Sequence, residues 1–170
     1  LGYLGSVIEI ETVSFPARET GKGALRVNDT AGSMVKDSMF NAGSALRKTF
    51  DIDLYSWDIH VNIIGGGQID GPSAGLAITL AVFSAITGLP LRQDVAVTGE
   101  VSLTGEVKAI GGIYEKIYGA KQAGMKTILV PSENQKGLKE IRGIEVKYVS
   151  DLKDALDCIC PTWRESAIGA

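Results

Sequence analysis

The chain has 170 residues, of which 45% are hydrophobic and 22% are charged, and its formal net charge is −3 at pH 7. This length is enough for one domain with a real core, and the composition excludes a disordered chain. Acidic and basic residues are interspersed, so neither a nucleic-acid partner nor an anionic membrane surface is predicted. We find no signal peptide and no run that could span a bilayer. Because residue 1 is not a methionine, we expect a piece of a longer protein.

Hydrophobic periodicity predicts a mixture of strands and helices in the first part of the chain. Ile59, Val61 and Ile63 alternate with polar residues, which is typical of a strand with one buried face. The predicted elements are a strand over 7–13, a loop or hairpin tip over 19–23, a returning strand over 24–27, a helix over 33–50 and a strand over 58–64.

The remainder of the chain continues the alternation of helices and strands. Gly88 and Pro90 are typical of a helix end, because glycine adopts the left-handed conformation there and proline cannot continue the helix. The predicted helices cover 72–87, 113–123, 133–141 and 152–159, and the predicted strands cover 95–103, 127–130 and 145–149. These elements predict the α/β class, as one domain over 1–170 with a mixed sheet and packed helices, and with 158–170 as a C-terminal tail.

Two cysteines, Cys158 and Cys160, lie near the end of the chain. Their spacing suits neither a structural disulfide nor, with a single histidine in the chain, a tetrahedral zinc site. We therefore expect reduced thiols in a reducing, cytoplasmic compartment, and no metal and no cofactor in this chain.

A glycine-rich run from Gly65 to Gly75 lies between a predicted strand and a predicted helix. Pro72 suits the first helical position, which places Ser73 in the first turn, where unpaired N–H groups favour a developing negative charge. Ser73 is thus a candidate nucleophile beside an oxyanion site. The alternative is a serine that only begins the helix. A phosphate-binding loop is excluded because the Walker pattern is absent.

Lys116 lies on the predicted helix over 113–123, on the same side as the apolar residues Ile113 and Ala120. A lysine buried on such a face loses hydration, so its pKa falls and a neutral amine can accept a proton from a serine hydroxyl. The alternative is a lysine whose stem packs while its ammonium group reaches water. Together, Ser73 and Lys116 suggest a serine nucleophile that a lysine activates.

Several motifs in register resemble the proteolytic domain of Lon proteases over about residues 58–138. The motifs are Asp70-Gly71-Pro72-Ser73-Ala74-Gly75, Thr87-Gly88-Leu89-Pro90, Asp94-Val95-Ala96-Val97-Thr98-Gly99-Glu100, Gly111-Gly112-Ile113-Tyr114-Glu115-Lys116 and Val130-Pro131-Ser132-Glu133-Asn134. The resemblance implies that Ser73 is the nucleophile and Lys116 the base. It also implies that the Thr98 hydroxyl holds the lysine amine, and that Asp70 can approach the lysine in resting forms and keep it charged.

Three further residues are candidates for supporting roles. Gly71 lets other backbone come close beside the nucleophile, and amides from this segment are expected to stabilise the oxyanion. Glu115 belongs to the same Glu-Lys motif as the base. Family members often have a histidine in the strand that leads into the glycine-rich run, so His60 is interpreted as an accessory polar residue near the cleft and not as the base.

The resemblance also implies an assembly. Subunits of the family form six-membered rings, and an attached ATPase module of the AAA+ type, where ATP and magnesium bind, feeds in unfolded or damaged proteins. We find no such module in this chain, so the isolated domain is expected to show weak peptidase activity at most. The alternative function is a Lon-like domain that only oligomerises or binds partners; such domains generally lack the serine, the lysine or both.

Overall fold

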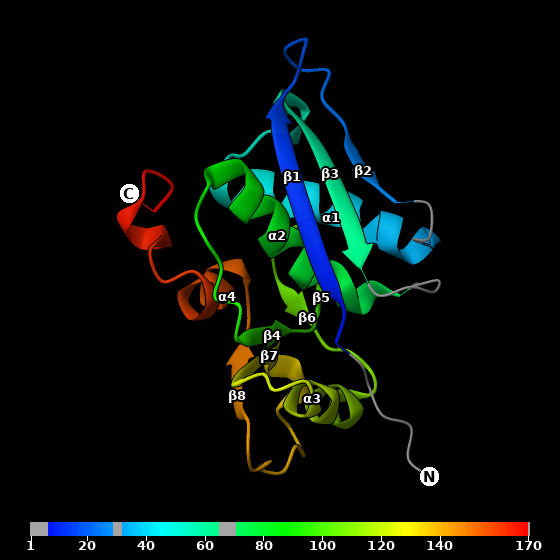
Figure 1. Cartoon of the computed structure of the whole chain (residues 1–170), viewed down its shortest axis with the longest axis vertical. Coiled ribbons are helices and arrows are strands. Elements are labelled where there is room, and N and C mark those ends of the chain that lie inside the picture. The colour runs from blue at the N-terminus through cyan, green and yellow to red at the C-terminus, as the bar shows by residue number, and fades with distance from the viewer. Residues whose placement is uncertain (1–6, 29–31, 65–70, 170) are drawn as a thin grey trace.

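The computed structural model describes residues 7–28, 32–64 and 71–169 (Figure 1). Its helices are α1 (Ser33–Phe50), α2 (Gly75–Thr87), α3 (Ile113–Gln122) and α4 (Leu152–Ile159). Its strands are β1 (Glu9–Pro16), β2 (Leu25–Val27), β3 (Trp57–Ile64), β4 (Val95–Val97), β5 (Glu100–Val101), β6 (Val107–Lys108), β7 (Thr127–Pro131) and β8 (Glu145–Val149). Short 3-10 turns cover Leu54–Ser56, Pro72–Ala74, Ser132–Asn134 and Trp163–Glu165. The predicted α/β class is confirmed.

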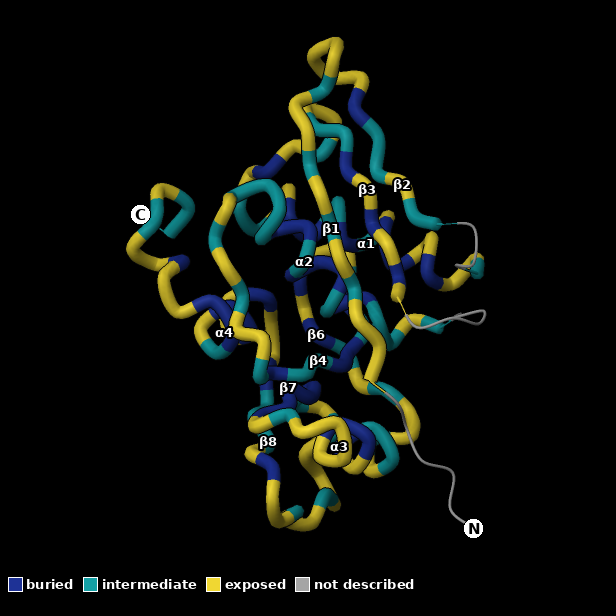
Figure 2. The backbone as a smooth tube through the Cα atoms, in the orientation of Figure 1, coloured by how far each residue is buried: buried dark blue, intermediate teal, exposed yellow. Residues whose placement is uncertain are grey.

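One half of the molecule is a three-stranded sheet in the order β1-β3-β2, with α1 and α2 behind it (Figure 1). The alternation predicted for β3 is confirmed, because Ile59, Val61 and Ile63 are at most 8% exposed and belong to the main core. The residues between them face solvent, and the yellow segments of the front of this sheet show the same pattern (Figure 2).

The hairpin predicted for 7–27 is wrong in its pairing. β2 does not return alongside β1; it runs parallel to β3, which lies between them, with Leu25 opposite Ile59. The chain crosses the end of β3 at Gly23, where an added Cβ would lie only 2.0 Å from the carbonyl oxygen of Trp57. The Ala24 N–H then donates to an Asp58 carboxylate oxygen at 3.2 Å. A tertiary contact, and not the turn, therefore decides where β2 pairs.

The other half is a parallel sheet in the order β4-β7-β8. β7 is buried along its whole length, as expected of a parallel strand covered on both faces. Leu129 belongs to the main core, whereas Ile128 and Val130 pack with Ile117 of α3 in a second apolar cluster. The two sides of β7 thus join α3 to the rest of the molecule.

The continuous strand predicted over 95–103 is wrong, because the chain breaks after β4 and resumes as β5, which pairs with β6. The break lies at Thr98 and Gly99. Gly99 has a φ of +154°, which favours glycine, and an added Cβ would lie 3.0 Å from a Val107 methyl carbon. The backbone groups of Gly99 bond to the segment around α2 instead of to a neighbouring strand.

The helix predicted over 133–141 is also wrong. Only the 3-10 turn over Ser132–Asn134 forms, and Gly137 has a φ of +80°. The side chains of Glu133 and Asn134 bond to the backbone of Ala109 and Ile110, so this segment follows contacts with a distant part of the chain and not its own periodicity.

The residues after α4 pack back onto the core. Trp163 is 2% exposed, its ring lies 5.7 Å from that of Phe50, and its indole N–H donates to Asp157 at 2.8 Å. Arg164 also donates to Asp157, and this hydrogen bond is the main reason why the pKa of the Asp157 carboxyl lies below its ordinary value. Among the described residues, no helix has both the length and the apolar character needed to cross a bilayer.

Replacing Trp163 with alanine is expected to lower the free energy of unfolding by about 3–5 kcal/mol, because a large buried ring leaves a cavity. Trp163→Phe keeps most of the ring and loses the N–H donor, so a loss of about 1 kcal/mol is expected. Urea unfolding measures both. A change below 1 kcal/mol for the alanine variant would mean that the C-terminal segment does not contribute to the core.

Candidate active site

A cleft of about 550 Å³ lies between the two halves of the molecule. Its walls come from the segment that enters β1, the end of β3, α2, β4 and α3. Four of the residues that the sequence singled out line this one cleft: Gly71, Ser73, Thr98 and Lys116. The structure therefore brings together side chains from two helices and a strand end that are far apart in the sequence.

Ser73 is half-buried in the 3-10 turn Pro72–Ala74, which leads into α2. Gly71 precedes this turn and has a φ of +148°, which favours glycine. The Ser73 carbonyl oxygen accepts from the Gly99 N–H at 3.0 Å, and the Leu76 N–H donates to the Gly99 carbonyl oxygen at 3.0 Å. A Cβ added at Gly75 would lie 3.3 Å from the Val101 nitrogen. The turn is thus held against the break between β4 and β5.

Thr98 occupies the break itself. It is 6% exposed, and its N–H donates to the Leu129 carbonyl oxygen of β7 at 3.0 Å. Because Gly99 is bonded to the turn of Ser73, Thr98 is fixed between that turn and the parallel sheet. Thr98 and Lys116 line the same cleft.

Lys116 lies one turn into α3, and its N–H donates to the Gly112 carbonyl oxygen at 3.2 Å. The residue is half-buried, and burial lowers the pKa of its amine below the ordinary value of 10.5. Desolvation disfavours the ammonium form. The apolar face that the sequence predicted for this helix therefore makes the neutral amine more accessible at neutral pH.

The other candidates lie elsewhere. His60 is exposed on the outer face of β3, where its ring lies 6.1 Å from that of Phe15, and it does not line the cleft. Glu115 does not line the cleft either. Its carboxylate lies over the N-terminal end of α3, where one of its oxygens would be 3.5 Å from a Cβ added at Gly112. Asp70 lies outside the described residues.

The cleft also holds charged residues that the sequence did not single out. Glu9 and Glu11 of β1 and Arg92, after α2, line it. The alternation of β1 places the two acids on the solvent face of an edge strand, where the Asn62 amide donates to a Glu11 carboxylate oxygen at 2.7 Å, so it gave no signal for the cleft. Within the residues that the structure describes, no three His, Cys, Asp or Glu side chains gather to hold a metal ion.

Comparison with known proteins gives one consistent family. The model of the family described as "Lon protease (S16) C-terminal proteolytic domain" matches residues 2–160. The chain is 41% identical to "Lon protease 2" of Bacillus subtilis over 168 residues, which cover 90% of this chain and 30% of that protein. It is 37% identical to "Lon protease" of Rickettsia bellii, covering 90% and 21%, and 35% identical to "Lon protease" of Xanthomonas oryzae pv. oryzae, covering 88% and 19%.

The chain thus spans less than a third of the length of these relatives. The match nevertheless spans the turn of Ser73, the break at Thr98 and the helix of Lys116. The chain therefore belongs to the family of Lon protease C-terminal proteolytic domains.

Proposed function

We propose that this domain is a serine endopeptidase, in which Ser73 is the nucleophile and Lys116 the general base, within an ATP-dependent protein-degrading machine. The observation that carries the proposal is that both residues line one cleft while burial lowers the pKa of the lysine. The relatives that share this domain are named as proteases. The alternative, a domain that only oligomerises or binds partners, gives no reason for a serine and a desolvated amine in one cleft.

In the proposed reaction, the neutral Lys116 amine takes the proton from the Ser73 hydroxyl as the oxygen attacks the scissile carbonyl carbon. The ammonium then gives this proton to the leaving amine as the C–N bond breaks, which leaves an acyl group on Ser73. A water molecule attacks the ester, Lys116 accepts a proton from it, and the released serine oxygen recovers a proton from Lys116.

The remaining residues have supporting roles in this proposal. The Thr98 hydroxyl holds the lysine amine, and backbone amides of the segment from Asp70 to Ser73 stabilise the tetrahedral oxyanion. Gly71 supports these roles because its backbone conformation leads directly into the turn of Ser73. In resting forms, the Asp70 carboxylate would hold Lys116 charged and the pair inactive.

An extended peptide is the substrate that the cleft suits best. β1 is at one edge of its sheet and β4 at one edge of the other, and residues of both line the cleft. Edge strands of this kind can pair with an added strand, which binds any sequence through main-chain hydrogen bonds. Unfolded or damaged proteins fit this mode, since their backbone N–H and C=O groups are free to pair along an extended segment.

The parent protein is proposed to be a cytoplasmic ring of six identical subunits whose AAA+ module binds ATP and magnesium. The length of the curated relatives, of which this domain covers 30% or less, supports the further module, and the ring and its compartment rest on the family resemblance. The remainder of such a protein has room for an unfolding module.

An active-site label tests the proposal. The full-length protein, treated with a peptide fluorophosphonate, is expected to carry one adduct on the peptide that contains Ser73, and casein cleavage with ATP is expected to stop as the adduct forms. Mass spectrometry locates the adduct. If cleavage is lost without a Ser73 adduct, or continues with Ser73 fully labelled, another residue is the nucleophile.

A further inference from the structure

The segment that leads into α3 is fixed from outside the sheet. β6 ends at Lys108 and α3 begins at Ile113. Between them, Gly111 has open space around it and Gly112 has a φ of +66°. Two adjacent glycines permit many backbone conformations, so contacts elsewhere must decide where the helix begins.

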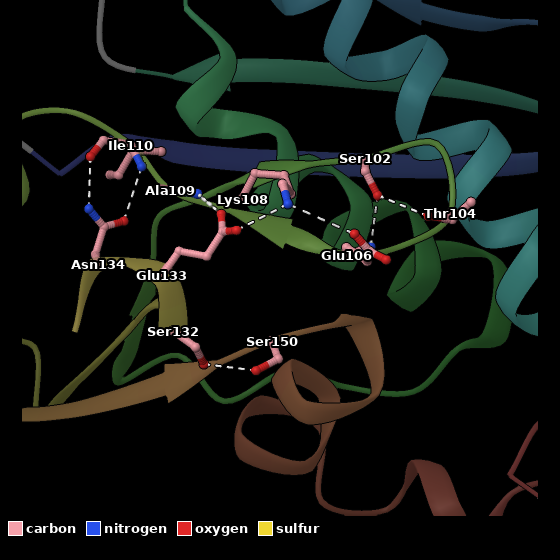
Figure 3. Close-up of polar contacts among 10 residues, drawn as sticks. All are labelled: Ser102, Thr104, Glu106, Lys108, Ala109, Ile110, Ser132, Glu133, Asn134 and Ser150. Atoms are coloured by element: carbon pink, nitrogen blue, oxygen red, sulfur yellow. Dashed lines mark hydrogen bonds and ion pairs between the residues drawn. The ribbon is translucent and has the colours of Figure 1, made fainter. Parts of the chain in front are cut away.

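Those contacts come from Glu133 and Asn134 (Figure 3). The Asn134 amide makes two hydrogen bonds to a single residue: its oxygen accepts from the Ile110 N–H at 3.0 Å and its nitrogen donates to the Ile110 carbonyl oxygen at 2.9 Å. Glu133 accepts from the Ala109 N–H at 2.8 Å and from the Lys108 amine at 3.1 Å. The two side chains thus bind the linker where the ladder of β6 has ended.

A third contact joins the same region to α3. The Tyr114 hydroxyl, in the first turn of the helix, accepts from the Lys139 N–H at 2.9 Å and donates to the Gly137 carbonyl oxygen at 3.3 Å. The segment 133–139 therefore holds both the linker and the helix start. Lys116 lies two residues after Tyr114, and its N–H donates to the Gly112 carbonyl oxygen.

We propose that Asn134, assisted by Glu133, is a positioning residue that sets the start of α3 and thereby directs the Lys116 amine into the cleft toward Ser73. This inference rests on the proposed function, in which Lys116 is the base. Asn134 does not line the cleft and does not touch the reacting atoms. It acts through the linker, because its amide supplies both the acceptor and the donor that bind the backbone of Ile110.

The Asn134→Ala variant removes both bonds, and Gln135→Ala, at the exposed neighbouring position, is the matched amide control. Displacement of a reacting group by about 1 Å can cost about 10²-fold in rate. In the full-length protein, we expect kcat for a fluorogenic peptide to fall about 10²-fold in Asn134→Ala, with KM nearly unchanged. Gln135→Ala is expected to match the wild type in both.

The pH profile separates positioning from general loss of structure. Activity rises with pH as the base loses its proton, and a misplaced Lys116 regains hydration, so the rising limb is expected to move to higher pH. The other charged groups that line the cleft, Glu9, Glu11 and Arg92, are unchanged in the variant. A smaller folded fraction lowers the amplitude of the profile and does not move it.

A second variant keeps the test decisive if Asn134→Ala folds poorly. Asn134→Asp keeps an acceptor for the Ile110 N–H and loses the donor, so an intermediate kcat and an intermediate shift of the profile are expected. The inference is overturned if folded Asn134→Ala has the kcat of the wild type. It is also overturned if both variants have lower activity at every pH and the rising limb of the pH profile stays where it is in the wild type. Ser73→Ala, assayed alongside, separates the two proposals: if it remains active, the proposed function itself has failed.

Discussion

Replacing Ser73 with alanine is expected to lower kcat for peptide and casein cleavage by at least about 10³-fold, while the protein keeps its fold. In the proposed mechanism, the variant lacks the Ser73 oxygen that would form the acyl bond, and single removals of a serine nucleophile have effects of this size or larger. The half-buried hydroxyl makes no contribution to the backbone bonds of its turn, which run through the Ser73 carbonyl oxygen. Steady-state kinetics and a thermal melt measure the two quantities.

Ser44→Ala is the matched control for this variant. Ser44 lies on α1, and its hydroxyl donates to the Leu103 carbonyl oxygen at 3.0 Å. Ser44 does not line the cleft. Its loss is expected to leave kcat within about twofold, since surface substitutions of this kind have small effects. Substantial cleavage by Ser73→Ala, with Ser44→Ala unchanged, would assign the nucleophile to another residue.

The Lys116→Met variant is expected to lose at least about 10³-fold in kcat and yet to melt at the same temperature as the wild type or higher. Methionine has a similar length and carries no charge to desolvate. Burial lowers the pKa of Lys116, so the folded protein holds this proton less tightly than the unfolded chain. Wild-type stability therefore rises with pH between the lowered pKa and 10.5, and the advantage of methionine is largest below that window and declines across it.

Lys121→Met, at an exposed position of the same helix, is the control for this pH dependence. It changes the same charge without removing a desolvated amine from the cleft, so neither activity nor the pH dependence of melting is expected to change appreciably. A Lys116→Met protein that melts well below the wild type at neutral pH would show that the lysine stabilises the fold and is not strained by burial.

Local patterns predicted the elements whose burial they determine. The helices over 33–50 and 152–159 form with the predicted bounds, because their apolar residues recur at helical spacing and face one core. β3 follows its alternation in the same way. Ser73 and Lys116 were singled out from a helix start and an apolar helix face and then from motifs that resemble a family; the structure places both at one cleft, and their catalytic roles stay predictions.

Contacts between distant segments account for what the patterns missed. Nothing near Thr98 indicates that Gly99 bonds to the turn of Ser73, so an apolar stretch was interpreted as one strand. The periodicity after Pro131 suits a helix, yet the side chain of Asn134 is engaged by Ile110, 24 residues earlier. His60 was expected near the cleft because its strand leads there, but the register of β3 turns it to the outer face.

The division of the cleft between two halves has a consequence for control. The proposed nucleophile belongs to the half built on β1 and α2, and the proposed base belongs to the half built on β7 and α3. The helix α3 packs onto β7 through the second apolar cluster, so a small shift of α3 against the main core would change the distance between the two proposed reacting groups while both parts stay folded. In the proposed mechanism, the domain would then lose activity without unfolding, because positions of side chains, and not the stability of the fold, decide whether the proton can move.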